Sequence, residues 1–232
     1  MRKKISSIIL LISFCMIFVS CSSRGETQDP PAVSPQIQIP KEQHAVFENG
    51  MYTLSMPSSI GLLTYYNQTD VRWANSIYGG TDSISLYGCG PTALAMIVSS
   101  FTNQEMTPDV MAVWARENNY WAAGSGSAHT LIPEGCAHFG LSVEPFSDYS
   151  EQGIIQALQN GSVFIALMGP GHFTSGGHFI ILADYWSGSA VRVADPNSLD
   201  NTQIPWEAGL IVNELDRSAQ AGGPLWKISI KK

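Results

Sequence analysis

The sequence is poor in basic residues and in cysteine. Its 232 residues include 12 Lys and Arg against 19 Asp and Glu, a formal net charge of −7, and they contain 4 cysteines. Such an acidic chain lacks the positive surface that nucleic acids or anionic lipid headgroups attract, which argues against nucleic-acid binding and against electrostatic docking on a membrane. No internal repeat is visible. No His, Cys, Asp or Glu cluster has metal-ligand spacing, so we expect no metal and no other cofactor.

The amino terminus has the pattern of a secretion signal. A basic region at 2–4 is followed by an apolar run over 5–19, which is too short for a convincing membrane span. The ending Val19-Ser20-Cys21 resembles the lipobox of bacterial lipoproteins, in which the cysteine is lipidated, with Phe18 where that pattern usually has leucine. We expect residues 1–21 to be a lipoprotein-type signal peptide with Cys21 as the lipidated residue. Secretion without lipidation and an uncleaved anchor are the alternatives.

Residues 22–60 have the composition of a linker. They are rich in Pro, Gln, Ser and Glu and show little hydrophobic periodicity, which predicts a disordered tether. A candidate edge strand over 51–56 is left unassigned. Residues 61–232 are expected to form one domain, which is long enough for a hydrophobic core. Removal of the signal takes three basic residues and leaves 9 against 19 acidic ones, a net charge of −10.

The hydrophobic periodicity of this domain changes from helical to strand-like along the chain. The expected helices span 91–101, 108–118, 131–139 and 151–159, and the expected strands span 162–168, 178–184, 190–194 and 225–230. In the second helix, Val110, Val113 and Trp114 are expected to face inward. Helices followed by antiparallel strands predict an α+β fold.

Cys89 stands where a glycine-rich loop turns into an apolar helix. Gly88 and Gly90 allow a tight turn and leave the sulfur accessible, and Pro91 suits a first helical turn because the N–H it lacks would be unpaired there. The partial positive charge of a helix N-terminus favours a thiolate. We therefore interpret Cys89 as a nucleophile. The alternatives are a buried small residue and a disulfide with Cys136, and a disulfide would exclude nucleophilic chemistry.

A cysteine nucleophile needs a base, and the base needs an orienting group. Of the 5 histidines, His178 is the best candidate because it begins a strand directly after Gly177, where glycine lets another segment approach closely. If that strand pairs with the next one in antiparallel fashion, Asp195 lies at the same hairpin end and can orient the imidazole. Asp184 and Asn197 are competing orienting residues.

An oxyanion hole needs hydrogen-bond donors. The backbone N–H of Cys89 is one candidate donor and the side-chain amide of Gln68 is the second, although Gln68 also fits an ordinary polar turn. The cleft is expected to be walled by residues 120–130 and 170–177. The candidate cleft residues are Gly88, Gly177, Trp121 and His172.

Four segments, in this order, resemble the bacterial papain-like cysteine peptidases related to the bacteriocin-processing (double-glycine) peptidases. The segments are Tyr66-Asn67-Gln68-Thr69-Asp70 with Arg72-Trp73-Ala74, Gly88-Cys89-Gly90-Pro91-Thr92-Ala93-Leu94-Ala95-Met96, Gly177-His178-Phe179 and Ala194-Asp195-Pro196-Asn197. The resemblance implies a papain-like α+β fold with the cysteine on the helical part and the histidine and aspartate on the antiparallel sheet.

The same resemblance implies a role for each of four residues: Gln68 as oxyanion donor, Cys89 as nucleophile, His178 as base and Asp195 as orienting residue. The processing peptidases have their glutamine a few residues before the cysteine, whereas 20 residues intervene here. No nucleotide-binding loop or series of membrane spans follows, so a leader-peptide substrate would be an analogy of fold alone.

These observations predict an extracytoplasmic cysteine peptidase that cleaves peptide bonds through a Cys-His-Asp triad and a thioester. One alternative is a cell-wall peptide hydrolase or transpeptidase with the same triad, and another is a surface module that binds peptides without cleaving them. The expected partner is a peptide or protein substrate. We expect a monomer on the outer side of a bacterial membrane, lipid-anchored or secreted.

Overall fold

The computed structural model describes residues 45–48 and 51–230. The expected signal peptide, its lipidation at Cys21 and the expected tether up to residue 44 lie outside the described residues. Within the described part of the chain, no helix combines the length and the apolar character needed to cross a membrane.

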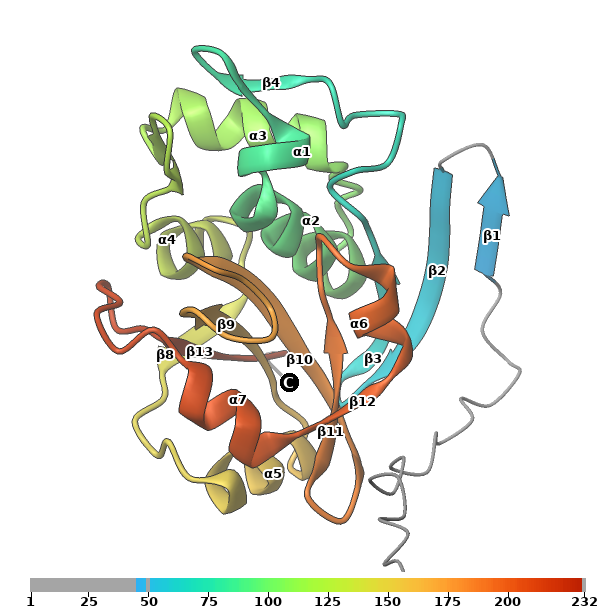
Figure 1. Ribbon diagram of the computed structural model, residues 1–232, viewed down its shortest axis with the longest axis vertical. Coiled ribbons are helices and arrows are strands. Elements are labelled where there is room, and N and C mark those ends of the chain that lie inside the picture. The colour runs from blue at the N-terminus through green and yellow to red at the C-terminus, as the bar shows by residue number, and fades with distance from the viewer. Residues whose placement is uncertain (1–44, 49–50, 231–232) are drawn as a thin grey trace, which may run out of the picture. The chain divides into compact units, whose positions relative to one another are not determined.

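A six-stranded antiparallel sheet forms the centre of the domain, in the order β12-β11-β10-β9-β13-β8 (Figure 1). The strands are β8 (Ser142–Pro145), β9 (Val163–Met168), β10 (His178–Ser187), β11 (Ala190–Ala194), β12 (Pro205–Glu207) and β13 (Leu225–Ser229). Every residue of β9 is buried. Because both faces of the sheet are covered here, the sequence of this strand is a continuous apolar run.

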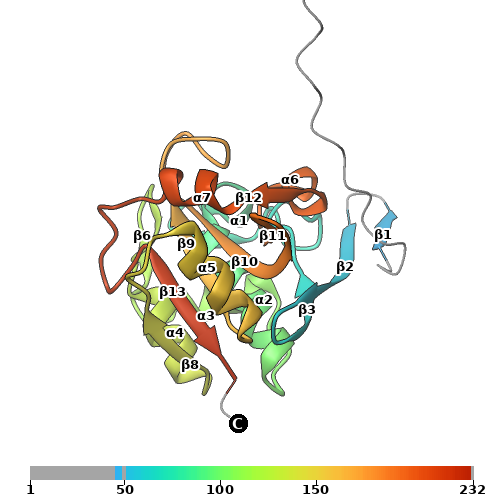
Figure 2. The same cartoon turned by 90° about the horizontal axis from the view of Figure 1, so that it is seen from below.

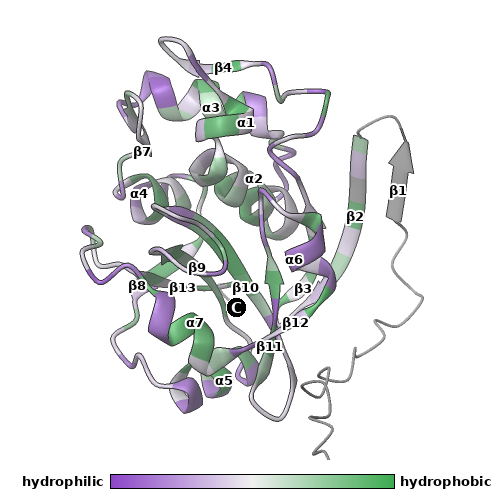
Figure 3. Ribbon diagram, viewed as in Figure 1, coloured by the Kyte–Doolittle hydropathy of each residue, from purple (hydrophilic) through white to green (hydrophobic). Residues whose placement is uncertain are grey.

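Helices cover the two faces of the sheet and divide the core into two clusters. The helices α2 (Cys89–Phe101), α3 (Pro108–Glu117) and α4 (Leu131–His138) contribute to the first cluster, and α5 (Glu151–Gln159) and α7 (Ala208–Glu214) contribute to the second. Alternate residues of β9 belong to alternate clusters: Ile165 and Leu167 to the first, Phe164 and Ala166 to the second. Figure 2 shows α2 and α5 on opposite sides of β10, and Figure 3 shows the apolar colour concentrated on α2 and the central strands.

A second, three-stranded sheet of order β1-β2-β3 precedes the helices. It consists of β1 (Ala45–Glu48), β2 (Met51–Ser58) and β3 (Gly61–Tyr65). Leu54 and Met56 of β2 are buried in the first core cluster, and β3 packs against α2. The domain therefore begins before the expected boundary at residue 61, because β2 supplies core side chains that the sequence analysis assigned to the tether.

The other elements are short. They are β4 (Ile77–Gly79), β5 (Asp82–Ser83), α1 (Ile84–Tyr87), β6 (Trp121–Ala122), β7 (Gly126–Ser127) and α6 (Leu199–Gln203). Five of these six elements have only two to four residues, too few for a hydrophobic period to stand out.

The predicted α+β fold is confirmed, and the four expected helices and four expected strands are present with shifts of a few residues at their ends. The inward face predicted for α3 is wrong for Val110 and Val113, whereas Trp114 is half-buried and packs against the first core cluster as predicted. Val110 and Val113 are 49% and 40% exposed, whereas Met111, Ala112 and Ala115 are buried. The buried face of α3 carries Ala112 and Ala115, whose small side chains allow α3 to approach α2 closely.

Candidate active site

Cys89 is the first residue of α2, and its position is fixed by tight packing on both sides. A Cβ atom on Gly88 would lie 2.5 Å from the carbonyl oxygen of Ile84, and one on Gly90 would lie 2.6 Å from Oγ of Ser127. Residues 90–98 of α2 are all buried, so the helix has no freedom to shift. The glycines on either side of Cys89 are therefore needed for close approach of the chain, and the thiol is held at a rigid helix start.

His178 and Asp195 meet at one end of the β10–β11 hairpin. Ile181 lies opposite Ala194 in this hairpin, which brings the residue after β11 beside the start of β10. Nε2 of His178 is 2.7 Å from Oδ1 of Asp195, and both side chains are buried. An acceptor at Nε2 favours a proton on that nitrogen, which leaves Nδ1 as the ring nitrogen for another partner.

The carboxylate of Asp195 is held by further donors. The backbone N–H of Asn197 donates to Oδ1 over 2.8 Å, and the side-chain amide of Asn201 donates to Oδ2 over 2.8 Å. The backbone N–H of Asp195 donates to the hydroxyl of Thr202, and its carbonyl accepts a hydrogen bond from the hydroxyl of Tyr65. These contacts compensate the burial of a carboxylate and fix its orientation.

The Cys89 thiol and the imidazole of His178 interact, and each shifts the pKa of the other. Burial raises the pKa of the Cys89 thiol, but the hydrogen bond with His178, the charge of that imidazole and the backbone N–H groups of Phe179 and Gly90 together bring it below its usual value. The N–H of Gly90 stabilises the negative sulfur in the way expected at a helix start, and the N–H of Phe179 adds a donor from β10.

The pKa of His178 is shifted in the opposite direction. Burial lowers it, but the hydrogen bond with Asp195, the hydrogen bond with Cys89 and the negative charges of both partners raise it well above its usual value. A lowered thiol pKa and a raised imidazole pKa both favour the thiolate–imidazolium pair, so the geometry holds a charged nucleophile and a proton donor side by side.

Gln68 is buried between the segments that carry Cys89 and Asp195. Its side-chain Nε2 donates to the carbonyl of Ser85 over 2.8 Å, and its backbone N–H donates to the carbonyl of Pro196 over 2.7 Å. Because a carbonyl only accepts, the Ser85 contact fixes which end of the amide is Nε2, and one N–H of that nitrogen is left over. Oε1 has no hydrogen-bond partner within the described part of the chain. The amide is therefore held rigidly beside the start of α2.

The competing orienting residues occupy other positions. Oδ1 of Asp184 accepts a hydrogen bond from the hydroxyl of Ser59 over 3.0 Å, further along β10. Asn197 contacts Asp195 through its backbone N–H rather than offering its side chain to the imidazole. The imidazole of His178 is bonded to Asp195.

Several supporting residues were missed in the sequence analysis. They are Tyr65, Ser85, Asn201 and Thr202. A partial signal exists for Asn201, because Ser198 accepts a hydrogen bond from its backbone N–H as the cap of α6. That cap predicts a helix after Asp195 but does not predict that Asn201 turns back to the carboxylate.

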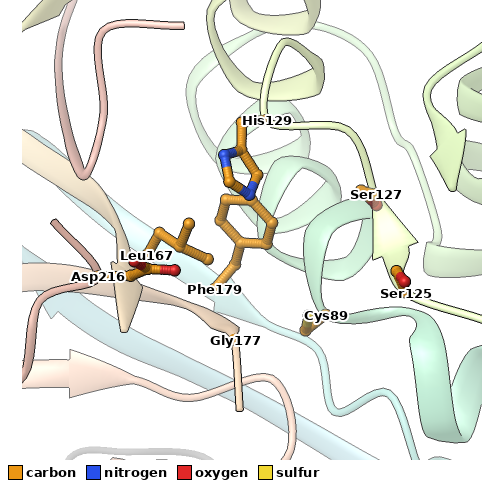
Figure 4. Close-up of a pocket in the computed structure, with 8 residues that line it drawn as sticks. All are labelled: Cys89, Ser125, Ser127, His129, Leu167, Gly177, Phe179 and Asp216. Atoms are coloured by element: carbon orange, nitrogen blue, oxygen red, sulfur yellow. The ribbon is translucent and has the colours of Figure 1, made fainter. Parts of the chain in front are cut away.

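Two pockets border Cys89. The larger, of ≈ 270 Å³, is shown in Figure 4 and is lined by Cys89, Ser125, Ser127, His129, Leu167, Gly177, Phe179 and Asp216. The smaller, of ≈ 250 Å³, is lined by Leu86, Tyr87, Cys89, Gly124, Ser125, Gly126 and Gly177. Both draw on the loops at 124–129 and 177, within the expected walls.

Of the four candidate cleft residues, Gly177 lines both pockets and the other three line neither. The indole N–H of Trp121 donates to Asp82, and its ring packs so closely on Gly79 that a Cβ there would lie 2.3 Å away. His172 forms an ion pair with Glu214. Trp121 and His172 are thus engaged in contacts of their own, and Gly88 serves the close packing before Cys89.

Cys89 and Cys136 are both free thiols, in contrast to the disulfide alternative. Cys136 is fully buried in the first core cluster, and burial raises its pKa to about 12. The two thiols therefore have opposite character, one activated and one inert.

Comparison with known proteins identifies a family for this chain. Residues 63–214 match the model of the Peptidase_C39 like family. A crystal structure from Bacillus anthracis, provisionally described as a C39-like peptidase, is similar over 63% of this chain and 90% of that chain, with 12% identity and a TM-score of 0.38, a likeness too low to carry an argument. No curated protein gives a significant match. By its family match, the chain belongs to the Peptidase_C39-like family of bacterial cysteine peptidases and has their papain-like α+β fold.

Proposed function

We propose that this protein cleaves peptide bonds with Cys89 as nucleophile, His178 as acid and base, and Asp195 as the residue that orients His178. The observation that carries the proposal is the position of His178, whose imidazole is hydrogen-bonded to the carboxylate of Asp195 and interacts with the thiol of Cys89. A domain that only binds peptides does not need a thiol with a lowered pKa, so the activated state of Cys89 favours catalysis over the binding alternative.

In the first half of the reaction, the thiolate of Cys89 attacks the carbonyl carbon of the scissile peptide and forms a tetrahedral oxyanion. The imidazolium of His178 then gives its Nδ1 proton to the leaving nitrogen as the C–N bond breaks, which releases an amine and leaves a thioester. The hydrogen bond from Nε2 to Asp195 keeps the ring oriented through this transfer.

In the second half, the neutral imidazole of His178 takes a proton from water, and the resulting hydroxide attacks the thioester carbonyl. Collapse of the second tetrahedral intermediate breaks the C–S bond, releases the carboxylic acid and restores the thiolate–imidazolium pair. An amine in place of water would give transpeptidation by the same route.

The oxyanion would be stabilised by two donors. The backbone N–H of Cys89 lies in the first turn of α2, where helical N–H groups have no acceptor within the helix. The second donor would be the N–H of Gln68 Nε2 that does not bind Ser85. Such donors act best when fixed before the reaction, and the buried, doubly anchored Gln68 meets that condition.

The proposed location is the outer side of a bacterial membrane. It is supported by the basic and apolar pattern over 2–19 and by the lipobox-like ending at Cys21. The proposed partner is a peptide or protein substrate, and the chain is proposed to act as a monomer.

The activity can be tested with the full chain, purified in detergent, and a defined pool of synthetic peptides in which all pairs of amino acids occur. We expect mass spectrometry to find new peptide ends with the unmutated chain and none with Cys89→Ala, while Cys136→Ala keeps the activity. Cleavage that persists in Cys89→Ala would refute the proposal, and so would the absence of cleavage by the unmutated chain.

A further inference from the structure

The larger pocket beside Cys89 combines an apolar wall with one carboxylate. Leu167 and Phe179 supply the apolar part, and Asp216 supplies the charge. Figure 4 shows Asp216 next to Leu167, across the pocket from Ser125 and with a carboxylate oxygen directed into the space. The volume of ≈ 270 Å³ lies just below the range of about 300–1,000 Å³ that is usual for whole small-molecule ligands. The pocket therefore suits a single long side chain.

The carboxylate of Asp216 is ionised and has an open acceptor. The N–H and the hydroxyl of Ser218 both donate to Oδ1, over 2.9 and 2.6 Å. The side-chain hydrogen bond from Ser218 holds the pKa of Asp216 below its usual value, against the opposing effect of burial. Oδ2 has no hydrogen-bond partner among the described residues. A charged group is thus presented to the pocket with half of its hydrogen-bonding capacity free.

No Lys or Arg of the described chain forms an ion pair with this carboxylate. None of the residues that line the pocket is Lys or Arg. Arg217, the next residue, is turned away, since it donates to the carbonyl of Val212 and lies over the ring of Tyr149 at 4.3 Å. His129 lines the same pocket, and its Nδ1 accepts a hydrogen bond from the backbone N–H of Gln220 over 3.0 Å. A positive charge on this ring would lower the pKa of Asp216 further.

Asp216 is also fixed relative to the proposed catalytic residues. Its backbone N–H donates to the carbonyl of Leu167 over 2.9 Å, and Leu215 forms a β-bridge with Met168. Met168 in turn lies opposite His178 in the β9–β10 pairing. The carboxylate is therefore tied by backbone hydrogen bonds to the strand next to the one that begins with His178. Such a group is preorganised to bind a substrate charge.

We infer that this pocket is a specificity subsite that accepts a lysine or arginine side chain close to the scissile bond, with Asp216 as its anionic partner. The aliphatic stem would lie on Leu167 and Phe179, and the cationic head would reach Asp216 as a charge-assisted hydrogen bond. The inference rests on the proposed peptidase function. It agrees with the charge of the domain, because residues 51–230 contain 5 basic against 15 acidic residues and would attract cationic peptides.

The test uses the full chain and pairs of peptides with blocked termini, so that only side chains supply charge. A peptide that is cleaved in the pool at a site near Lys is resynthesised with norleucine, which keeps the stem and removes the charge, and with Glu. We expect kcat/KM to be about 10- to 100-fold higher for Lys than for norleucine, and lowest for Glu. This comparison uses only the unmutated chain, so its result does not depend on whether a variant folds.

Two variants assign the preference to one residue. Asp216→Asn is expected to bring the Lys to norleucine ratio close to one while cleavage of the norleucine peptide is kept, because Asn preserves the acceptor for Ser218. Asp148→Asn is the matched control, since Oδ1 of Asp148 accepts the same two hydrogen bonds from Ser150 but Asp148 lines neither pocket beside Cys89. This control is expected to keep the ratio of the unmutated chain.

The outcomes separate the two claims. Cleavage with no preference for Lys over norleucine, or a preference that survives Asp216→Asn, would overturn the subsite and leave the peptidase activity intact. Absence of all cleavage by the unmutated chain would overturn the proposed function, and the subsite would fall with it. A Lys preference that Asp216→Glu retains and Asp216→Asn loses would support the subsite.

Discussion

His178 and Asp195 form a buried hydrogen bond of 2.7 Å through Nε2 of the imidazole. This choice of nitrogen decides the chemistry of the site, because it leaves Nδ1 for the thiol of Cys89. The imidazole is then held between an anionic carboxylate and a sulfur that it helps to ionise. In the proposed reaction, this arrangement places the proton for the leaving amine on Nδ1.

The carboxylate of Asp195 should matter both for the orientation and for the charge of His178. In Asp195→Ala, Nε2 of His178 loses its acceptor and the ring is free to rotate, so we expect kcat/KM to fall about 10²- to 10⁴-fold. The pKa of Cys89, measured by alkylation, should rise because the imidazolium is less stable. Asp184→Ala is the matched control, since Asp184 bonds Ser59 instead. Equal losses in both variants would contradict the assignment.

Gln68 should act on the transition state more than on substrate binding. Gln68→Ala removes the proposed second oxyanion donor, and we expect kcat to fall about 10²- to 10³-fold with little change in KM. Steady-state kinetics on one peptide would measure this split. A large rise in KM at constant kcat would instead indicate that Gln68 only shapes the cleft. The alkylation profile of Cys89 should stay unchanged, which separates this role from a loss of folding.

Gly88 should tolerate no side chain. In Gly88→Ala the new Cβ would lie 2.5 Å from the carbonyl oxygen of Ile84, a backbone atom that has no room to move away. We expect a loss of about 1–3 kcal/mol in the free energy of unfolding, together with lower activity as the start of α2 shifts. Gly176→Ala is the control, because nothing lies within 4 Å of its added Cβ. Urea denaturation of both variants should show the loss in Gly88→Ala alone.

Asp70 should make stability depend on pH in the acid range. Its carboxylate is buried and bonded to Arg72 and to the backbone N–H of Tyr52. Burial raises the pKa of Asp70, but the hydrogen bonds from Arg72 and Tyr52 outweigh it and bring the pKa below its usual value. A carboxyl with a lowered folded pKa stabilises the fold above its unfolded pKa of about 3.9, and this contribution is lost as pH falls through the folded value.

The comparison with Asp70→Asn checks this sign. We expect the variant to be less stable at pH 7 and to lose less stability than the unmutated chain when the pH is lowered from about 6 to about 3. Thermal unfolding followed by circular dichroism at these pH values would measure the slope of stability against pH for the unmutated chain and for the variant. Identical slopes would show that other carboxyl groups account for the acid sensitivity.

The pairing of residues close in sequence could be predicted, whereas for distant segments the sequence indicated candidate residues but not the contacts that bring them together. His178 and Asp195 lie on one hairpin, so strand pairing alone places them at the same end. Gln68 reaches the same site only because the chain moves away from the site after Gln68 and comes back to it at Cys89. The contacts of Gln68 with Ser85 and Pro196 cannot be predicted from the sequence. Asp216 is a similar case, since its position depends on a loop that pairs with β9.

The change in hydrophobic periodicity was enough to predict the fold class, but the periodicity did not always predict which side of a helix is buried. The apolar residues of α3 surround much of the helix, and the packing against α2 selects the side with Ala112 and Ala115 over the side with Val110. The sequence of β2 does not predict a strand clearly, because a strand that serves one small sheet carries a weak pattern, although Leu54 and Met56 are core residues.

The central claim is that His178 activates Cys89, and the pH dependence of Cys89 alkylation by iodoacetamide tests it most directly. Mass spectrometry distinguishes Cys89 from Cys136, which is buried and serves as an unreactive internal control. We predict that Cys89 reacts with an apparent pKa below the usual thiol value of about 8.5 and that His178→Ala raises this pKa. A Cys89 that titrates at or above about 8.5 in the unmutated chain, or whose profile is unchanged by His178→Ala, would contradict the account.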